Sequence, residues 1–175
     1  MPESLHQLIQ KVLSMRCETQ TIEVKAAAQG APRIYDTLSS FSNQEEGGAI
    51  VFGIDETNGF ELCGVYDAQA LHKSVVEQCR EMEPQIHPFI QTGELEGKTI
   101  VVAYIRGLMM GERPAYRRTS GMLKGSYVRV GDADEHMTDA ELYEIDAFKK
   151  GVSDDVSVHP DASRDMLDAD FMDRY

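Results

Sequence analysis

A run of positive charge between positions 106 and 129 stands out from an otherwise acidic sequence. Arginine and lysine bind phosphate groups because they combine a positive charge with several hydrogen-bond donors. Glu112 is the single acid in the run. Because positions 107–125 are rich in glycine, we predict an exposed loop that contacts nucleic-acid phosphates. The run begins at Arg106, and the predicted phosphate contacts are Arg113, Arg117, Arg118, Lys124 and Arg129.

A second interpretation of the same cations stays open. The chain carries 17 basic and 30 acidic residues, a formal net charge of −13, which on average repels nucleic acid. The loop would then be a solvated segment that pairs with acids elsewhere on the domain. Arg129 lies in the alternating segment 127–130. We interpret it first as a clamp on a neighbouring carboxylate and second as a phosphate contact.

Other reactive side chains show no spacing that indicates a cofactor. Cys17, Cys63 and Cys79 form no Cys-x-x-Cys pair, which argues against a zinc site and a disulfide framework. The five histidines are equally scattered. Gly47-Gly48 is not followed by the Lys-Ser/Thr of a phosphate-binding P-loop, so we interpret it as a tight turn. We therefore expect free thiols and no bound cofactor.

The hydrophobic pattern predicts the elements that must position these residues. Apolar residues repeat with helical spacing in four segments, about 3–14, 32–43, 68–83 and 138–150. Alternating or continuous apolar runs predict six strands, at 20–26, 49–54, 60–65, 89–95, 99–105 and 126–130. Helices and strands alternate irregularly around a hairpin turn at 96–98. We therefore predict an α+β fold, a mixed β-sheet of about six strands with about four helices packed on it.

The pattern changes after residue 150. Residues 151–175 contain seven Asp and two Arg, a net charge of −5, and few apolar side chains. We predict one domain over residues 1–150, followed by an acidic linker and the start of a further domain over 151–175. No apolar run reaches the roughly 20 residues that span a bilayer, and no signal-peptide pattern is visible. We therefore expect a cytoplasmic protein.

Four groups of motifs, in order along residues 16–148, resemble one known family. They are 18–25 (ETQTIEVK); 39–43 (SSFSN) with Gly47-Gly48 and 51–56 (VFGIDE); Gly64-Val65; and Arg113-Pro114 with 127–131 (YVRVG) and 138–142 (TDAEL). Together they are similar to the Schlafen AlbA-like (AlbA_2) domain. Three residues separate Asn43 from the glycine pair, where the family more often has two.

The resemblance implies an α+β domain that binds DNA and often stands at the front of bacterial transcriptional regulators. An ATPase-like or winged-helix domain would follow it in the same chain. We therefore hypothesise a DNA-binding regulatory domain of a transcriptional regulator, without catalysis of its own. A protein–protein interaction module, including a homodimer formed through an exposed sheet edge, is an alternative that the sequence leaves open.

The resemblance also implies a catalytic alternative. In animal Schlafens a related domain cleaves RNA with acidic residues, and the matching positions here are Glu18, Glu23 and Asp55, with Glu56 a weaker match. Such a metal-dependent endoribonuclease would hold Mg²⁺ or Mn²⁺ between these carboxylates. Glu18 and Glu23 are five positions apart, so they converge only if the chain bends before the strand. The other interpretation places Glu23 and Lys25 on a solvated strand face and the later acids in a turn.

Overall fold

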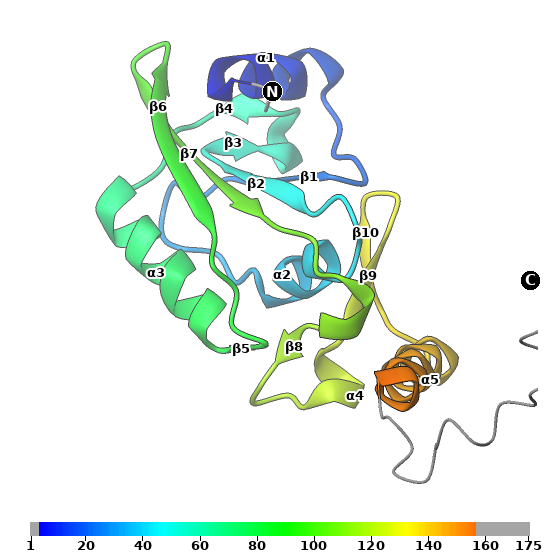
Figure 1. Ribbon diagram of the computed structural model, residues 1–175. Helices are drawn as coiled ribbons and strands as arrows, with labels where there is room; N and C mark the ends of the chain where they lie inside the picture. Colours follow the sequence, from blue (N-terminus) through cyan, green and yellow to red (C-terminus); the bar gives the residue numbers. More distant parts are fainter. Residues whose placement is uncertain (1–3, 157–175) are drawn as a thin grey trace, which may run out of the picture.

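Four strands form the central sheet of the computed structural model, which describes residues 4–156 (Figure 1). In pairing order they are β1 (Ile22–Lys25), β2 (Gly48–Phe52), β7 (Lys98–Ile105) and β6 (Phe89–Leu95). β1 runs parallel to β2, and the other neighbours are antiparallel. The predicted α+β class with a mixed sheet is thus confirmed.

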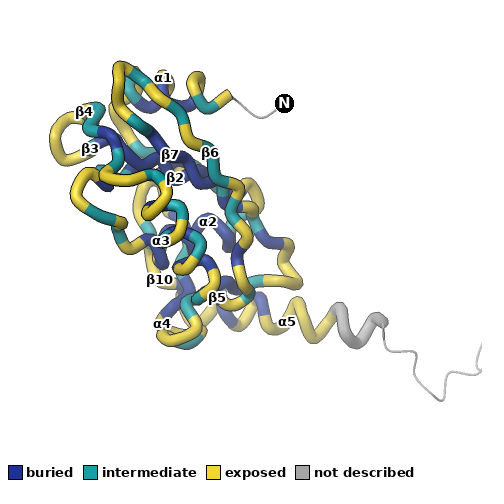
Figure 2. The backbone as a smooth tube through the Cα atoms, turned by 90° about the vertical axis from the view of Figure 1, so that its left-hand side faces the viewer, coloured by how far each residue is buried: buried dark blue, intermediate teal, exposed yellow. Residues whose placement is uncertain are grey.

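Helices cover both faces of this sheet, because the inner strands are apolar on both sides. They are α1 (Leu5–Met15), α2 (Tyr35–Ser42) and α3 (Ala68–Arg80). Leu8 and Val12 of α1 pack on one face, and Phe41 of α2 and Val75 of α3 pack on the other. In Figure 2 the central strands β2 and β7 are dark blue, the colour of buried residues. The Asp67 side chain caps the start of α3 by accepting a hydrogen bond from Ala70 N.

A hairpin packs beside α2, and a final helix follows it and packs against the hairpin. They are β9 (Tyr127–Val130), β10 (Ala133–His136) and α5 (Asp139–Val156). Thr138 and Glu141 form a capping box at the start of α5: Thr138 donates to the Glu141 carboxylate, and Glu141 N donates to Thr138 Oγ1. α5 continues past its predicted end at 150 because a helix tolerates one glycine, Gly151, at a cost of about 1 kcal/mol.

The predicted glycine-rich loop contains short regular elements. They are η2 (Met110–Glu112), β8 (Tyr116–Arg117) and α4 (Met122–Gly125). β8 pairs with β5 (Met82–Glu83), which fixes this region to the end of α3. After β2 the chain forms β3 (Ile54–Asp55), η1 (Glu56–Asn58) and β4 (Glu61–Leu62). Two-residue strands carry too little alternation to be seen in a sequence, so there are more strands than the six predicted.

The turn between α2 and β2 requires glycine at position 47. Gly47 has a φ of +67°, and a Cβ there would lie 2.2 Å from Ile105 O. This agrees with a tight turn, not a phosphate cradle. Of the predicted linker, positions 151–156 continue α5, and the remainder lies outside the described residues. Among residues 4–156, no helix has the length and apolar character needed to cross a membrane.

Candidate nucleic-acid interface

Arg117 and Arg118 lie at an edge of the molecule where β8 meets the end of α3. Strand pairing places Arg117 opposite Met82, and Arg118 N donates to Glu81 O at 3.0 Å. The Arg117 guanidinium lies over the Tyr35 ring, 3.9 Å from its centroid, and pairs with the Glu81 carboxylate at 3.0 Å. Arg117 is therefore partly a packing residue, and its neighbour Arg118 is more exposed.

Other cations lie along the same edge. Arg118 pairs loosely with Glu83, with 3.5 Å between Nε and the carboxylate oxygen. Lys124 is exposed on α4, which packs against β8. Arg33 lies 5.8 Å from the same tyrosine ring that Arg117 covers, and Arg80 is the exposed last residue of α3. We call this surface the basic rim: Arg33, Arg80, Arg117, Arg118 and Lys124.

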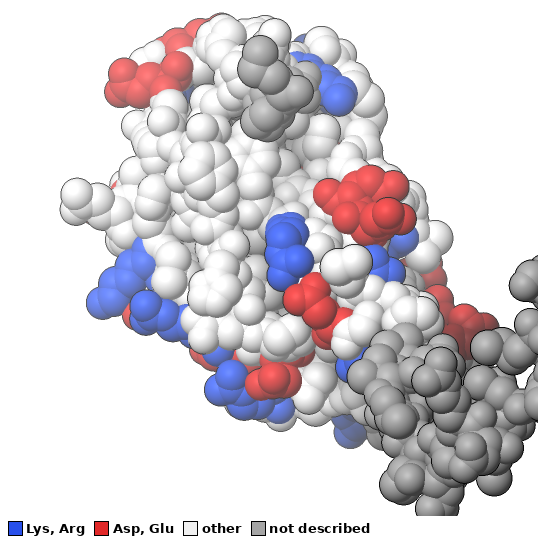
Figure 3. Space-filling model, in the orientation of Figure 1, with Lys and Arg blue, Asp and Glu red and all other residues white. Residues whose placement is uncertain are grey.

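Acidic residues are interleaved with the basic rim. Glu77, Glu81 and Glu83 lie among its five cations, so its formal charge is +2 (five minus three), in a chain of −13. Figure 3 shows the same mixture along the lower edge of the molecule, where basic and acidic side chains lie side by side. The rim is thus a modest positive surface, not a continuous cationic patch.

Two further arginines of the basic run hold the turn around η2. Arg113 Nε donates to Leu108 O at 2.9 Å, and the residue is half-buried. Arg106 pairs with Glu112 at 3.4 Å. Arg106, Arg117 and Arg118 therefore each pair with an acid of the domain, as the second interpretation of the basic run expects.

Arg129 lies inside the protein, and its side chain has no exposed surface. Its Nη1 is 2.8 Å from a Glu23 oxygen and 2.9 Å from an Asp134 oxygen. Its Nη2 donates to the carbonyls of Thr19 and Ile22 at 3.2 and 3.4 Å. Burial alone would lower the pKa of Arg129, but Asp134 and Glu23 outweigh it and raise the pKa, so the group stays charged. The geometry is that of a carboxylate clamp and leaves the guanidinium no surface for phosphate.

The solvated strand face expected for Glu23 is wrong. Glu23 is 4% exposed and forms ion pairs with both Arg129 and Lys25. The alternation of β1 places it on the α2 side of the sheet, where the β9–β10 hairpin supplies Arg129 and Asp134. The strand face that points away from α1 would be solvated only if no element covered it, and here α2 and the β9–β10 hairpin cover it.

Glu18 lies just before β1, close enough for the charges of Glu23 and Lys25 to act on its carboxyl group. The chain bends between Thr19 and Ile22, which form an isolated bridge. This bend lets the Glu18 carboxylate accept a hydrogen bond from Val24 N at 2.7 Å. Burial raises the pKa of Glu18 to about 7, and the charges of Glu23 and Glu56 add to the rise, while Val24 N–H and Lys25 oppose it. Burial lowers the pKa of Lys25, but its ion pair with Glu23 and the charges of Glu18 and Glu56 outweigh burial and raise the pKa.

Asp55 has a different task from the other acids. Its carboxylate caps η1, accepting hydrogen bonds from Thr57 N at 3.0 Å and Thr57 Oγ1 at 2.7 Å. Within residues 4–156, no three His, Cys, Asp or Glu side chains form a group able to hold a metal ion. Glu23 is already committed to two cations and Asp55 to a turn. The residues do not fit the shared Mg²⁺ or Mn²⁺ of the nuclease alternative.

Glu18→Gln is expected to change how stability depends on pH. The folded protein favours the protonated carboxyl, so it binds more protons than the unfolded chain between the ordinary pKa of 4.5 and about 7. The stabilising contribution of the protonated Glu18 carboxyl is therefore fully present below pH 4.5 and is lost as the pH rises through 7. After allowance for solvent exposure, glutamine should recover on the order of 1 kcal/mol at pH 8.

Urea unfolding at several pH values between 4.5 and 8 measures this effect. The matched control is Glu46→Gln, an exposed carboxylate elsewhere on the domain. If the wild-type and Glu18→Gln curves run parallel across this range, the carboxyl does not titrate in the folded protein as described.

Sequence reasoning missed Asn43 as an organising residue. Its buried amide donates to Ser39 Oγ, Ala115 O and Tyr127 O, and its carbonyl accepts from Ala115 N. It thereby joins α2 to the segment before β8 and to β9. The available signal was its place in the family-like motif at 39–43, which carries no information on its partners.

Comparison with known proteins adds to this geometry. The N-terminal domain of a RecG-related protein from Nitrosomonas europaea superposes with a TM-score of 0.58 at 23% identity, covering 78% of this chain and 94% of that one. The DIP2311 protein from Corynebacterium diphtheriae superposes with a TM-score of 0.54 at 16% identity. The match covers 81% of this chain but only 28% of that one, so this chain spans less than a third of its length. These structures share the fold. No curated protein sequence matches the chain.

A family model described as Schlafen, AlbA_2 matches residues 18–138, which is more than half of the chain. The match contains β1 with Glu18 and Glu23, the turn at Gly47, and the segment that carries Arg117, Arg118 and Lys124. The resemblance read from the motifs is therefore confirmed, and the chain belongs to the Schlafen AlbA_2 family.

Proposed function

We propose that this domain binds nucleic acid, with DNA as its target, through phosphate contacts from the basic rim. The observation that carries the proposal is the convergence of five cations from three separate segments on one edge of a strongly acidic domain. Family membership supports it, and the name of the Nitrosomonas europaea relative refers to an ATP-dependent DNA helicase. Service as the DNA-binding part of a transcriptional regulator is the finer form of the same proposal.

Exposed ion pairs on the rim do not prevent phosphate binding. The Arg118–Glu83 pair is long and exposed on both sides, and such pairs contribute at most about 1 kcal/mol. A phosphate can therefore replace Glu83 at little cost. The surrounding acids keep such binding weak and strongly dependent on salt. Backbone contacts of this kind position a duplex but do not read its sequence.

Arg118→Ala combined with Lys124→Ala tests the rim. Losing two phosphate contacts should weaken binding to all duplex sequences alike and reduce the slope of log affinity against log salt by about 1.8. Fluorescence anisotropy with a short labelled duplex, between about 50 and 200 mM salt, measures both quantities. Arg117 is left intact because it also packs on Tyr35.

Lys98→Ala with Lys149→Ala is the matched control, since it removes the same charge from exposed positions on β7 and α5. The control variant should retain most of the wild-type affinity. Equal losses in the two double variants would mean that only net charge matters. A wild-type domain that binds no duplex at the lowest salt would end the proposal.

The geometry favours binding over metal-dependent cleavage, because Glu23 and Asp55 already have other partners. A homodimer, and an ATPase-like or winged-helix domain in the same chain, stay predictions that this surface neither requires nor opposes.

A further inference from the structure

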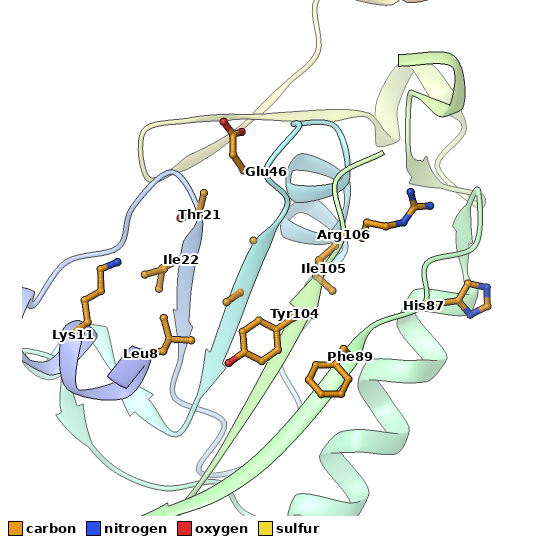
Figure 4. A pocket seen from close by; sticks show the side chains of 12 residues that line it. Leu8, Lys11, Thr21, Ile22, Glu46, His87, Phe89, Tyr104, Ile105 and Arg106 are labelled. Atoms are coloured by element: carbon orange, nitrogen blue, oxygen red, sulfur yellow. The ribbon is translucent and has the colours of Figure 1, made fainter. Parts of the chain in front are cut away.

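A hollow of about 410 Å³ opens on the α1 face of the sheet (Figure 4). It lies beyond the part of this face that α1 covers, and α1 and β1 form one side while β6 and β7 form the other. Its floor is apolar and includes Ile22 and Ala49. The basic rim does not contribute to it. The hollow is thus a second, separate concave surface of the domain.

Two aromatic rings line the β6–β7 side of the hollow. Phe89 on β6 pairs in register with Tyr104 on β7. Their ring centroids are 5.9 Å apart and the planes are inclined by 33°. Phe89 is 62% exposed, although it sits beside an apolar floor that could have buried it. β6 is an edge strand among the described residues, so this ring is open to a ligand.

Cationic side chains flank the aromatic pair on both sides. Lys11 lines the hollow from α1, and Arg106 and His87 line it from the opposite side (Figure 4). Glu46 is the single acid among the described residues that line the hollow. With histidine neutral, the described lining residues carry a formal charge of +1 (two minus one), and Glu112, the partner of Arg106, lies outside this lining. The pair that Arg106 forms with Glu112 is exposed, so a phosphate can compete for it.

We propose that this hollow binds single-stranded nucleic acid, with a base stacked on Phe89 and the backbone reaching toward Lys11 and Arg106. The inference rests on the proposed function and names a second surface for it. An exposed aromatic ring beside cations is the arrangement by which proteins hold unpaired strands, because every base has a face that stacks. A duplex offers no free base face except at its ends.

The position of the cations favours a strand over a free nucleotide. A nucleotide carries its phosphate on one side of the base, whereas a strand has phosphates on both sides. Lys11 and Arg106 lie on opposite sides of the hollow, which the aromatic pair also lines. Such an arrangement engages a backbone that enters at one side and leaves at the other.

Phe89→Ala, measured by fluorescence anisotropy with a labelled oligothymidylate, tests the proposal. Removing one stacking platform should weaken single-strand binding roughly tenfold and leave duplex binding unchanged. Phe89→Tyr keeps the ring and should bind the single strand like the wild type. Because Phe89 is exposed, neither substitution removes core packing, and circular dichroism verifies the fold.

Three results would overturn the inference. One is a Phe89→Ala variant that binds the oligothymidylate as tightly as the wild type. Another is displacement of the oligothymidylate by thymidine monophosphate at equal concentration, which would indicate a nucleotide site. The third is a change of mass in light scattering on Phe89→Ala, which would mean that a second copy covers the hollow. Loss of duplex binding in Arg118→Ala/Lys124→Ala with single-strand binding intact separates the two surfaces.

Discussion

Arg129→Met should lower the free energy of unfolding by about 3–5 kcal/mol, because it leaves the buried Glu23 carboxylate and the half-buried Asp134 carboxylate without their shared cation. Methionine fills much of the same volume, so the loss reports the charge and not a cavity. Urea unfolding followed by circular dichroism measures it. If Arg129 contacted phosphate instead, the variant would lose nucleic-acid binding while keeping its stability.

Arg118→Met is the matched control for that experiment. It makes the same substitution in an exposed ion pair and should change stability by less than about 1 kcal/mol. Glu23→Gln added to Arg129→Met should recover part of the loss, since a neutral amide is less costly to bury than an unpaired carboxylate. A loss below about 1 kcal/mol in Arg129→Met would show that the buried pair contributes little.

Asn43→Ala should destabilise the domain by at least about 2 kcal/mol. The substitution leaves Ala115 N and Tyr127 O without their side-chain partner, whereas Ala115 O keeps the Ser39 hydroxyl as a donor. Each buried polar group left unpaired costs about 1–3 kcal/mol. Asn43→Asp should be at least as harmful, because a carboxylate oxygen would then face two carbonyl oxygens. Thermal and urea unfolding both measure these losses.

Asn58→Ala provides the comparison, since Asn58 is an exposed amide that bonds to the nearby Glu61. Its effect should stay within about 0.5 kcal/mol. A similarly small effect for Asn43→Ala would mean that water replaces the missing amide and that the joint between α2 and β9 does not depend on it.

Local signals in the sequence predicted the central sheet and its helices well. β2 is buried as its continuous apolar run indicates, and the caps at Asp67 and Thr138 lie where the residue types place them. These features depend on neighbours within a few positions. Hydrophobic periodicity and capping therefore report them directly, whereas two-residue strands such as β5 and β8 leave no such pattern.

The partners of charged residues were not predictable in the same way. Arg117 and Glu81 are 36 positions apart, and Arg129 reaches the carbonyl of Ile22 across 107 positions. Alternation in β1 correctly separated Glu23 from Val24, but it could not indicate that the second face is covered. The family motif contained Arg129 and Asn43 without distinguishing buried joints from ligand contacts. Only the folded topology makes that distinction.

The dependence of Glu23 on Arg129 has a consequence for biosynthesis. A ribosome releases β1 and its acid long before it releases the hairpin that neutralises it, and β1 must also wait for its parallel neighbour β2. During this interval the carboxylate has only Lys25 as a counter-ion within its own strand. The α2 face of the sheet therefore cannot form its finished core until translation has passed Asp134. Cooperative folding then begins only when nearly the whole domain has been synthesised.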